Sequence, residues 1–142
     1  METNKIYQGD CLKIMKGGLN MTNELTINGK VYVEKASIKD FKEAKSVKGM
    51  KYVLIRTYSA GVFVGYLKSK KDSEVVLLNA RRLWYWDGAS SLSQLAMEGV
   101  TRPKTCKFPV EVSEVTLLNV IEIIPVTEKA KKSISEVEVW KQ

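Results

Sequence analysis

The stretch from residue 80 to residue 100 has the highest density of side chains suited to binding a ligand. It reads ARRLWYWDGASSLSQLAMEGV, with two arginines, three adjacent aromatic residues, an Asp-Gly turn and a run of small residues. Guanidinium groups bind phosphate oxygens through paired N–H donors, and aromatic rings stack on flat bases. This combination predicts a site for an anionic, nucleotide-like ligand.

If residues 81–86 form a strand, their side chains alternate between the two faces of a sheet. Arg82, Trp84 and Trp86 would then share one face. This set suits a nucleotide because two indoles lie beside a guanidinium, and stacking contributes about 1–3 kcal/mol per base. The alternative is that both indoles pack in the core or at a subunit interface.

Other groups in the chain are also suited to anions. Arg56 follows a run of branched apolar residues, which suggests a partly buried arginine that needs an anionic or carbonyl partner. The turn at 58–61 offers backbone amides and a hydroxyl. Ser90 and Ser91 open a predicted helix, whose free N–H groups favour negative charge. An outward arginine, a plain hairpin turn and ordinary serine capping are the alternatives. The candidate ligand residues are Arg56, Tyr58, Ser59, Ala60, Gly61, Arg82, Trp84, Trp86, Asp87, Ser90, Ser91, Gln94 and Arg102.

The composition argues against most catalytic mechanisms. The 142 residues include no histidine, which removes the usual general base and the commonest zinc ligand. Cys11 and Cys106 are isolated and form no metal-ligand pair, so we expect reduced thiols, no metal and no cofactor. Asp87, Glu98 and Glu74 form no evident carboxylate pair. The protein is therefore expected not to be an enzyme.

The net charge of +7 is concentrated in the middle of the chain. Residues 51–110 carry ten basic and four acidic groups, whereas residues 111–142 carry four and six. A positive field favours phosphates and other anionic partners. With no apolar run of about 20 residues and no signal peptide, we expect a soluble cytoplasmic protein without a membrane partner.

The patterns predict one α+β domain at 21–142 after an N-terminal extension at 1–20. An Asn28-Gly29 turn between branched residues indicates a hairpin. Expected strands of an antiparallel sheet with about five to seven strands are 51–57, 61–68, 74–78, 81–86, 110–118 and 119–126. Two or three short helices are expected: 37–47, a segment capped by Ser90 or Ser91 that stops at Gly99, and 128–134 capped by Thr127.

Three segments resemble a family of small phage proteins. They are IRTYSAGVFVG, ARRLWYWDGASSLSQLAMEGV and CKFPVEVSEVTLLNVIEIIP, and the resemblance runs from about Lys51 to Ile134. The family is the first described family of phage Thoeris anti-defence proteins. The segments before Met50 and after Ile134 lie outside this motif.

The resemblance implies a sponge that performs no chemistry. Proteins of this family sequester the cyclic ADP-ribose isomer made by a bacterial TIR-domain defence enzyme, so that the downstream effector stays inactive. They form homodimers with ligand pockets at the subunit interface, dimers can assemble into hexamers, and some members also capture cyclic trinucleotides. The expected location is the host cytoplasm.

By this resemblance, the candidate residues divide among the parts of the ligand. Arg56 and residues 59–61 would lie near the pyrophosphate, Trp84 and Trp86 near the adenine, and Ser90, Ser91 and Gln94 near ribose or phosphate. A binding module for single-stranded nucleic acid is the alternative, since basic residues interleaved with aromatic ones suit that role too. A third hypothesis is an enzyme that cleaves a signalling nucleotide, and such an enzyme would need a carboxylate as its general base.

Overall fold

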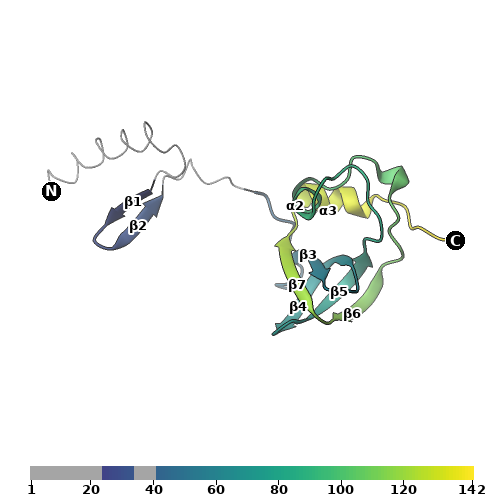
Figure 1. Ribbon diagram of the computed structural model, residues 1–142, viewed down its shortest axis with the longest axis horizontal. Coiled ribbons are helices and arrows are strands. Elements are labelled where there is room, and N and C mark those ends of the chain that lie inside the picture. Colours follow the sequence, from purple (N-terminus) through teal and green to yellow (C-terminus); the bar gives the residue numbers. More distant parts are fainter. Residues whose placement is uncertain (1–23, 34–40) are drawn as a thin grey trace. The chain divides into compact units, whose positions relative to one another are not determined.

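The computed structural model of the protein describes residues 24–33 and 41–142. Contacts divide the chain into two units, one ending at Phe41 and one comprising Lys42–Gln142, and each is described by itself (Figure 1). The predicted extension at 1–20 and the first part of the predicted helix at 37–47 lie outside the described residues.

The first unit contains a two-stranded hairpin. Strand β1 (Glu24–Ile27) pairs antiparallel with β2 (Lys30–Val33), and Ile27 lies opposite Lys30. Asn28 and Gly29 between them have φ values of 51° and 76°, the left-handed conformation that a two-residue hairpin turn requires. The predicted hairpin is confirmed.

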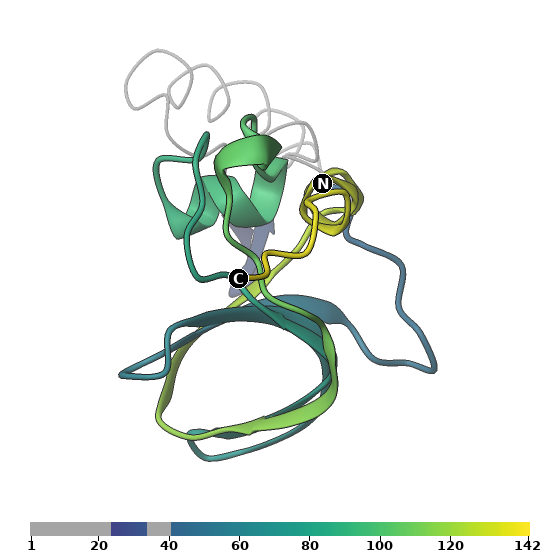
Figure 2. The same cartoon turned by 90° about the vertical axis from the view of Figure 1, so that its right-hand side faces the viewer.

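The second unit, which we call the main unit, is built on a five-stranded antiparallel sheet. Its strands are β3 (Tyr52–Thr57), β4 (Val62–Lys71), β5 (Glu74–Arg82), β6 (Val112–Leu117) and β7 (Val120–Pro125). Their order in the sheet is β6-β5-β4-β3-β7. Strands β6 and β7 occupy opposite edges although only Leu118 and Asn119 separate them, so the sheet curls into the nearly closed ring of Figure 2.

Strand β5 differs from the sequence-based expectation. The pattern predicts two strands, at 74–78 and 81–86, and the structure has one strand that ends at Arg82. Asn79 is accommodated with a φ of 48°, and the register with β4 shifts between Val64 and Tyr66. Gly65 lies opposite this irregularity, where a Cβ atom would approach the Leu78 carbonyl oxygen to 3.0 Å. The break predicted between residues 78 and 81 is therefore a β-bulge within one continuous strand.

Helices cover the outer face of the curled sheet (Figure 2). They are α2 (Leu92–Glu98) and α3 (Glu128–Ser135), and a short 3-10 helix, η2, spans Pro103–Thr105. Ser91 and Thr127 cap α2 and α3 as predicted, through side-chain oxygens that accept from Gln94 N and Ala130 N. The α+β prediction is confirmed.

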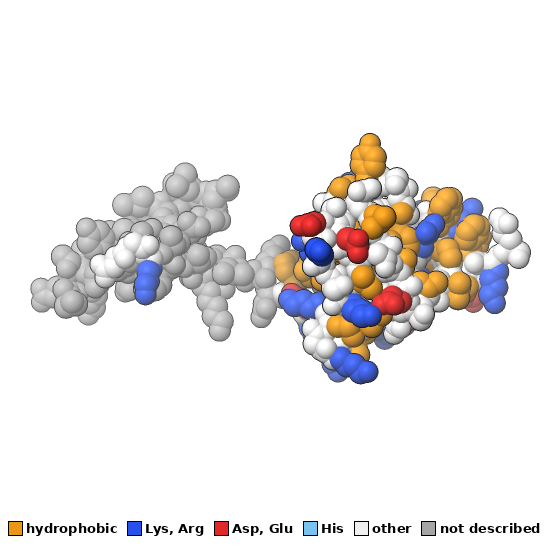
Figure 3. Space-filling model, turned by 90° about the horizontal axis from the view of Figure 1, so that it is seen from below, with side chains coloured by type: hydrophobic (Ala, Val, Ile, Leu, Met, Phe, Trp, Pro, Cys, Tyr) orange, Lys and Arg blue, Asp and Glu red, His pale blue; other side chains and the backbone are white. Residues whose placement is uncertain are grey.

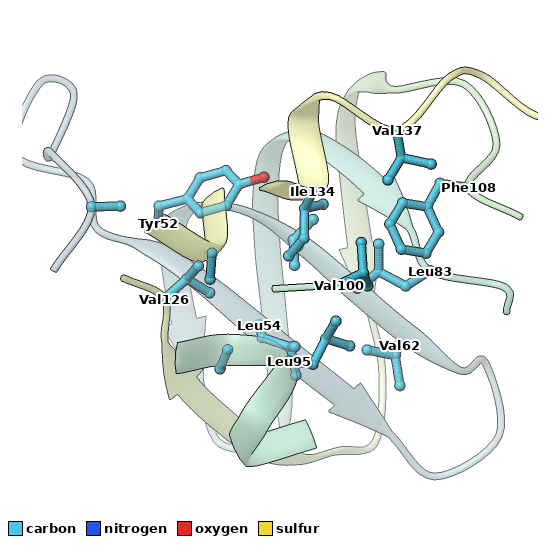
Figure 4. Packing of buried hydrophobic residues seen from close by; sticks show 14 of the residues in the cluster. Tyr52, Leu54, Val62, Leu83, Leu95, Val100, Phe108, Val126, Ile134 and Val137 are labelled. Atoms are coloured by element: carbon cyan, nitrogen blue, oxygen red, sulfur yellow. The ribbon is translucent and has the colours of Figure 1, made fainter. Parts of the chain in front are cut away.

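Two hydrophobic clusters form because side chains alternate along each strand. On β3, Val53 and Ile55 face the interior of the ring, together with Phe63 and Leu77. Tyr52 and Leu54 face the helices and pack with a cluster that includes Leu95, Phe108 and Ile134 (Figure 4). Strands β3 and β4 thus contribute one face to each core, whereas β6 contributes only to the inner one, through Val115 and Leu117.

The helix predicted at 37–47 is wrong over its described part. Residues 41–47 form no helix; Glu43 is bridged to Thr127, and Ala44 N donates to Val126 O at 2.9 Å. Glu128 Oε2 also accepts from Lys45 N at 2.9 Å. The apolar spacing fits a helix, but pairing with the chain between β7 and α3 satisfies the backbone and buries Ala44.

Among the described residues, no helix has the length and apolar character needed to cross a membrane.

Candidate functional site

The structure brings two of the predicted ligand segments to one end of the sheet. Arg56 on β3 pairs with Val62 on β4, and Leu83 N donates to Val62 O at 2.8 Å. The turn at 58–61 joins β3 to β4, and Trp84 follows Leu83 directly. Arg56, the turn at 58–61 and Trp84 therefore lie near the place where β3, β4 and the chain after β5 run side by side.

Arg56 is exposed, which corrects the expectation of an arginine leaning into the core. It lies opposite Glu122 of β7 as well as Val62 of β4, and it shares the outer face with Val62. Helix α2 packs on this same outer face through Leu95 and Ala96. The guanidinium is therefore available to a ligand bound on the helix side of the sheet.

The turn at 58–61 is held by its own hydrogen bonds. Gly61 O accepts from Thr57 N at 3.0 Å and from Thr57 Oγ1 at 2.9 Å, while Tyr58 N donates to Asn119 O. Gly61 has a φ of 96°, a Cβ atom there would meet only open space, and Tyr58 is 80% exposed. The turn thus presents an aromatic ring to solvent from a fixed backbone.

Arg82 and Arg81 lie on opposite faces, as strand alternation requires. Arg82 pairs with Phe63 and stacks on its ring with 4.8 Å between the guanidinium carbon and the ring centre. Since Phe63 belongs to the inner cluster, Arg82 points away from the face that carries Arg56. A pocket on one face of a single protomer therefore cannot contain both Arg82 and Arg56.

The prediction that Arg82, Trp84 and Trp86 share one strand face is wrong. The strand ends at Arg82, and the backbone of Trp84 and Tyr85 pairs with Lys107 instead. Trp86 is half-buried and packs against the outer cluster, opposite to Arg82, whereas Trp84 is 62% exposed. Of the two indoles, Trp84 is therefore the one that is open to a ligand.

Asp87 and Arg102 bind each other. Arg102 Nη1 lies 3.1 Å from Asp87 Oδ1, and Thr105 Oγ1 donates to Asp87 Oδ2 at 3.1 Å. Partial burial acts to raise the pKa of the Asp87 carboxyl, but the hydrogen bonds from Thr105 and Arg102 and the guanidinium charge outweigh it, so the pKa lies below its ordinary value. The ion pair fastens the Asp87 loop to the loop before η2.

The polar residues at the start of α2 satisfy one another. Ser91 Oγ accepts from Gln94 N at 3.2 Å, and Gln94 Oε1 accepts from Ser90 N and Ser90 Oγ at 2.9 and 2.8 Å. Gln94 Nε2 donates to Glu98 Oε2. This reciprocal cap accounts for all three predicted residues, so a ligand would have to replace these bonds to use them.

Cys106 is a structural thiol. It is buried, accepts from Asp87 N at 3.4 Å and donates to Arg102 O at 3.4 Å. Burial raises its pKa, so the thiol stays protonated near neutral pH and is a weak nucleophile.

Of two surface hollows in the main unit, one includes a single predicted residue, Arg82, and the other includes none. The latter, of about 610 Å³, lies between the η2 loop and the C-terminal tail. Its lining residues are Pro103, Lys104, Cys106, Glu136, Glu138, Val139, Trp140 and Lys141. This hollow was not predicted from the sequence. The sequence feature at this place is the alternation of Glu136 and Glu138 with apolar residues. It does not indicate that the tail runs beside Phe108.

The second hollow, of about 290 Å³, lies beside Arg82 and is named the Arg82 hollow below. It is lined by Phe63, Ala80, Arg82, Pro109, Val110, Val112 and Val115. Figure 3 shows hydrophobic and basic side chains interspersed over one face of the main unit.

The comparisons with known proteins give one match. A family model described as a domain of unknown function (DUF6948) matches residues 50–134, more than half of the chain. The chain belongs to the DUF6948 family. The matched region begins just before β3 and ends in α3, so it contains both segments that meet at Val62. No curated protein and no solved structure matches the chain.

Proposed function

We propose that the protein binds and sequesters, without cleaving it, a cyclic ADP-ribose isomer made by bacterial TIR-domain immunity. Its role would be that of a phage anti-defence protein acting in the host cytoplasm. The resemblance of the segments at 55–65, 80–100 and 106–125 to Thoeris anti-defence proteins supports this proposal.

The observation that carries it is the exposure of aromatic rings beside an arginine at one end of the sheet. Trp84 and Tyr58 are 62% and 80% exposed. Arg56 precedes Tyr58 by two residues and pairs with Val62, whose carbonyl accepts from Leu83 N just before Trp84. Exposed aromatic rings offer flat faces for stacking, and an indole with a guanidinium suits an adenine linked to phosphate.

A second protomer would complete the site. Arg56, Trp84 and the turn at 58–61 are exposed in one protomer, and neither of the two hollows described above includes them. A tightly held ligand buries most of its area, which a facing subunit would supply. Tyr58 N donates to Asn119 O, and the exposed Leu118 and Ile121 lie one and two residues from Asn119, so they add apolar area for a homodimer or hexamer.

Sequestration requires no reacting group, and the polar residues near the site are engaged in structure. Asp87 is paired with Arg102, and the Cys106 thiol is hydrogen-bonded to Asp87 N and Arg102 O. We therefore propose binding without catalysis. Capture of cyclic trinucleotides at a separate site is part of the same proposal, taken from the resemblance.

Binding of single-stranded nucleic acid is the alternative. Exposed Trp84 and Tyr85, beside a basic central segment, would stack on bases of a polymer as well as on a single adenine. A polymer would bind with an affinity that rises with length and falls steeply with salt, whereas a sponge saturates with one small molecule per site.

The test is a calorimetric titration of purified variants with cyclic ADP-ribose isomers. Arg56→Ala and Trp84→Ala should each weaken binding at least about tenfold, because each removes a charged or stacking contact. Lys129→Ala is the matched control, since Lys129 is exposed and lies on α3, outside the proposed site. Wild-type affinity in both site variants would refute the site.

A further inference from the structure

The Arg82 hollow has apolar walls and a single charged group. Six of its seven lining residues are Phe, Ala, Pro or Val, and Arg82 is the seventh. Val110 is 63% exposed at this hollow, and Val112 is exposed as well. The side chains of these two valines are therefore accessible to a ligand.

The guanidinium at this hollow is oriented but not neutralised. Stacking on Phe63 fixes its position, and no ion pair of the described residues includes Arg82. Arg81 is its opposite, since Arg81 turns to the other face and donates to five carbonyl oxygens there. An arginine held by a ring and left without an acceptor can bind an anion with little loss of side-chain entropy.

Size limits the occupant. The hollow measures about 290 Å³, at the lower bound of roughly 300 Å³ for pockets that hold drug-sized ligands. At roughly 30 Å³ for each water molecule in the liquid, it has room for on the order of ten non-hydrogen atoms. A whole dinucleotide such as a cyclic ADP-ribose isomer is too large for it.

Chemistry limits the occupant further. The apolar lining side chains offer no hydrogen-bonding group to read the edge of a base. One guanidinium balances one negative charge, and its fork matches the two oxygens of a carboxylate. A phosphate dianion would need a second cation, and Arg82 is the one cation in the lining.

From these observations we propose that the Arg82 hollow is a binding site for a small carboxylate with an apolar body, distinct from the site around Arg56 and Trp84. The carboxylate pairs with Arg82, and the apolar body lies against Val110, Val112 and Val115. This site stands independently of the proposed nucleotide sequestration, because Arg82 and Arg56 lie on opposite faces of the sheet.

The experiment is an NMR titration of the full chain with three probes. Octanoate has both the charge and the apolar body, octanamide has the same body without the charge, and acetate has the charge alone. We expect octanoate to shift the methyl signals of Val110, Val112 and Val115 and to bind at least about tenfold more tightly than either other probe. Equal binding of octanoate and octanamide, or shifts confined to other residues, would overturn the proposal.

Variants connect the binding to Arg82. Arg82→Gln should remove the preference for octanoate over octanamide, and Val110→Asp should do the same by placing a competing carboxylate at the hollow. Arg56→Gln, the matched control on the other face, should leave octanoate binding unchanged. If Arg82→Gln and Val110→Asp fold and keep the preference, the site is wrong. Loss of nucleotide binding by Arg56 variants would bear only on the proposed function.

Discussion

Two neighbouring arginines illustrate how one residue position decides a side chain's role. Arg81 is buried, lies 5.4 Å above the Phe108 ring, and donates to the carbonyl oxygens of Phe108, Pro109, Ile134, Val137 and Glu138. Burial lowers its pKa from the ordinary value, but the group stays charged. Arg81 ties the C-terminal tail to the loop at 108–109, whereas Arg82 is exposed on the other face of the sheet.

Replacement of Arg81 should therefore be costly. Arg81→Leu leaves several carbonyl oxygens without their charged donor and should lower the free energy of unfolding by at least about 2 kcal/mol. Arg82→Leu is the matched control and should cost less than about 1 kcal/mol, because its guanidinium is exposed. Urea denaturation of the three proteins measures both values. Equal losses would contradict the structural role of Arg81.

Gly88 occupies a position that leaves no room for a side chain. Its φ is 90°, and a Cβ atom there would lie 2.2 Å from Thr101 Oγ1 and 2.6 Å from Thr101 N. Gly88→Ala should destabilise the protein by more than about 2 kcal/mol, since steric overlap adds to the cost of positive φ. Gly49→Ala is the control, with a φ of 77° and open space where its Cβ would lie. Thermal unfolding should rank Gly88→Ala clearly below Gly49→Ala, and the reverse order would be inconsistent with this packing.

The Asp87 pair predicts a pH dependence. Because the pKa of Asp87 is lower in the folded than in the unfolded protein, its contribution to stability is present above the unfolded pKa of about 4 and is lost as pH falls through the folded value. Asp87→Asn should flatten this acid-side loss of stability while leaving the slope above pH 5 unchanged. The free energy of unfolding, measured between pH 2.5 and 7 at intervals of about 0.5 pH unit, tests this expectation. An identical acid-side slope in the variant would count against the Asp87–Arg102 pair.

At the scale of elements, local signals predicted most of the boundaries. The Asn28-Gly29 turn, the Ser91 and Thr127 caps and the stop at Gly99 are all dictated by neighbouring residues, and each is found where expected. The failures at 41–47 and at Trp84–Trp86 have a different cause. In both, backbone pairing with a distant segment, Val126 or Lys107, overrides the local pattern.

Helix α2 offers a test of its cap. Ser91→Ala should cost about 1 kcal/mol, because it removes the oxygen that accepts from Gln94 N. Ser93→Ala is the matched control within the same helix, where an exposed serine replaced by alanine should be neutral or slightly stabilising. Chemical denaturation compares the two, and a cost for Ser93→Ala as large as that for Ser91→Ala would refute the assigned cap.

At the scale of the whole molecule, the sequence predicted the α+β class but not the curl of the sheet. The alternation on β3 supplies one apolar set for the ring interior and another for the helices, which is why two cores form. The candidate site could be predicted by composition because Arg56, Tyr58 and Trp84 are chemically distinctive. Its division between faces could not, since it depends on where β5 ends and how Arg82 pairs with Phe63.

A protein that sequesters a cyclic ADP-ribose isomer must bind the molecule and return it unchanged. The most direct measurement is a titration of the purified protein with a panel of cyclic ADP-ribose isomers, followed by heat denaturation and chromatography of the released material. We predict saturable binding of at least one isomer and recovery of the same molecule in full. Release of a cleaved product would contradict sequestration, and absence of binding to every isomer would contradict the proposed function altogether.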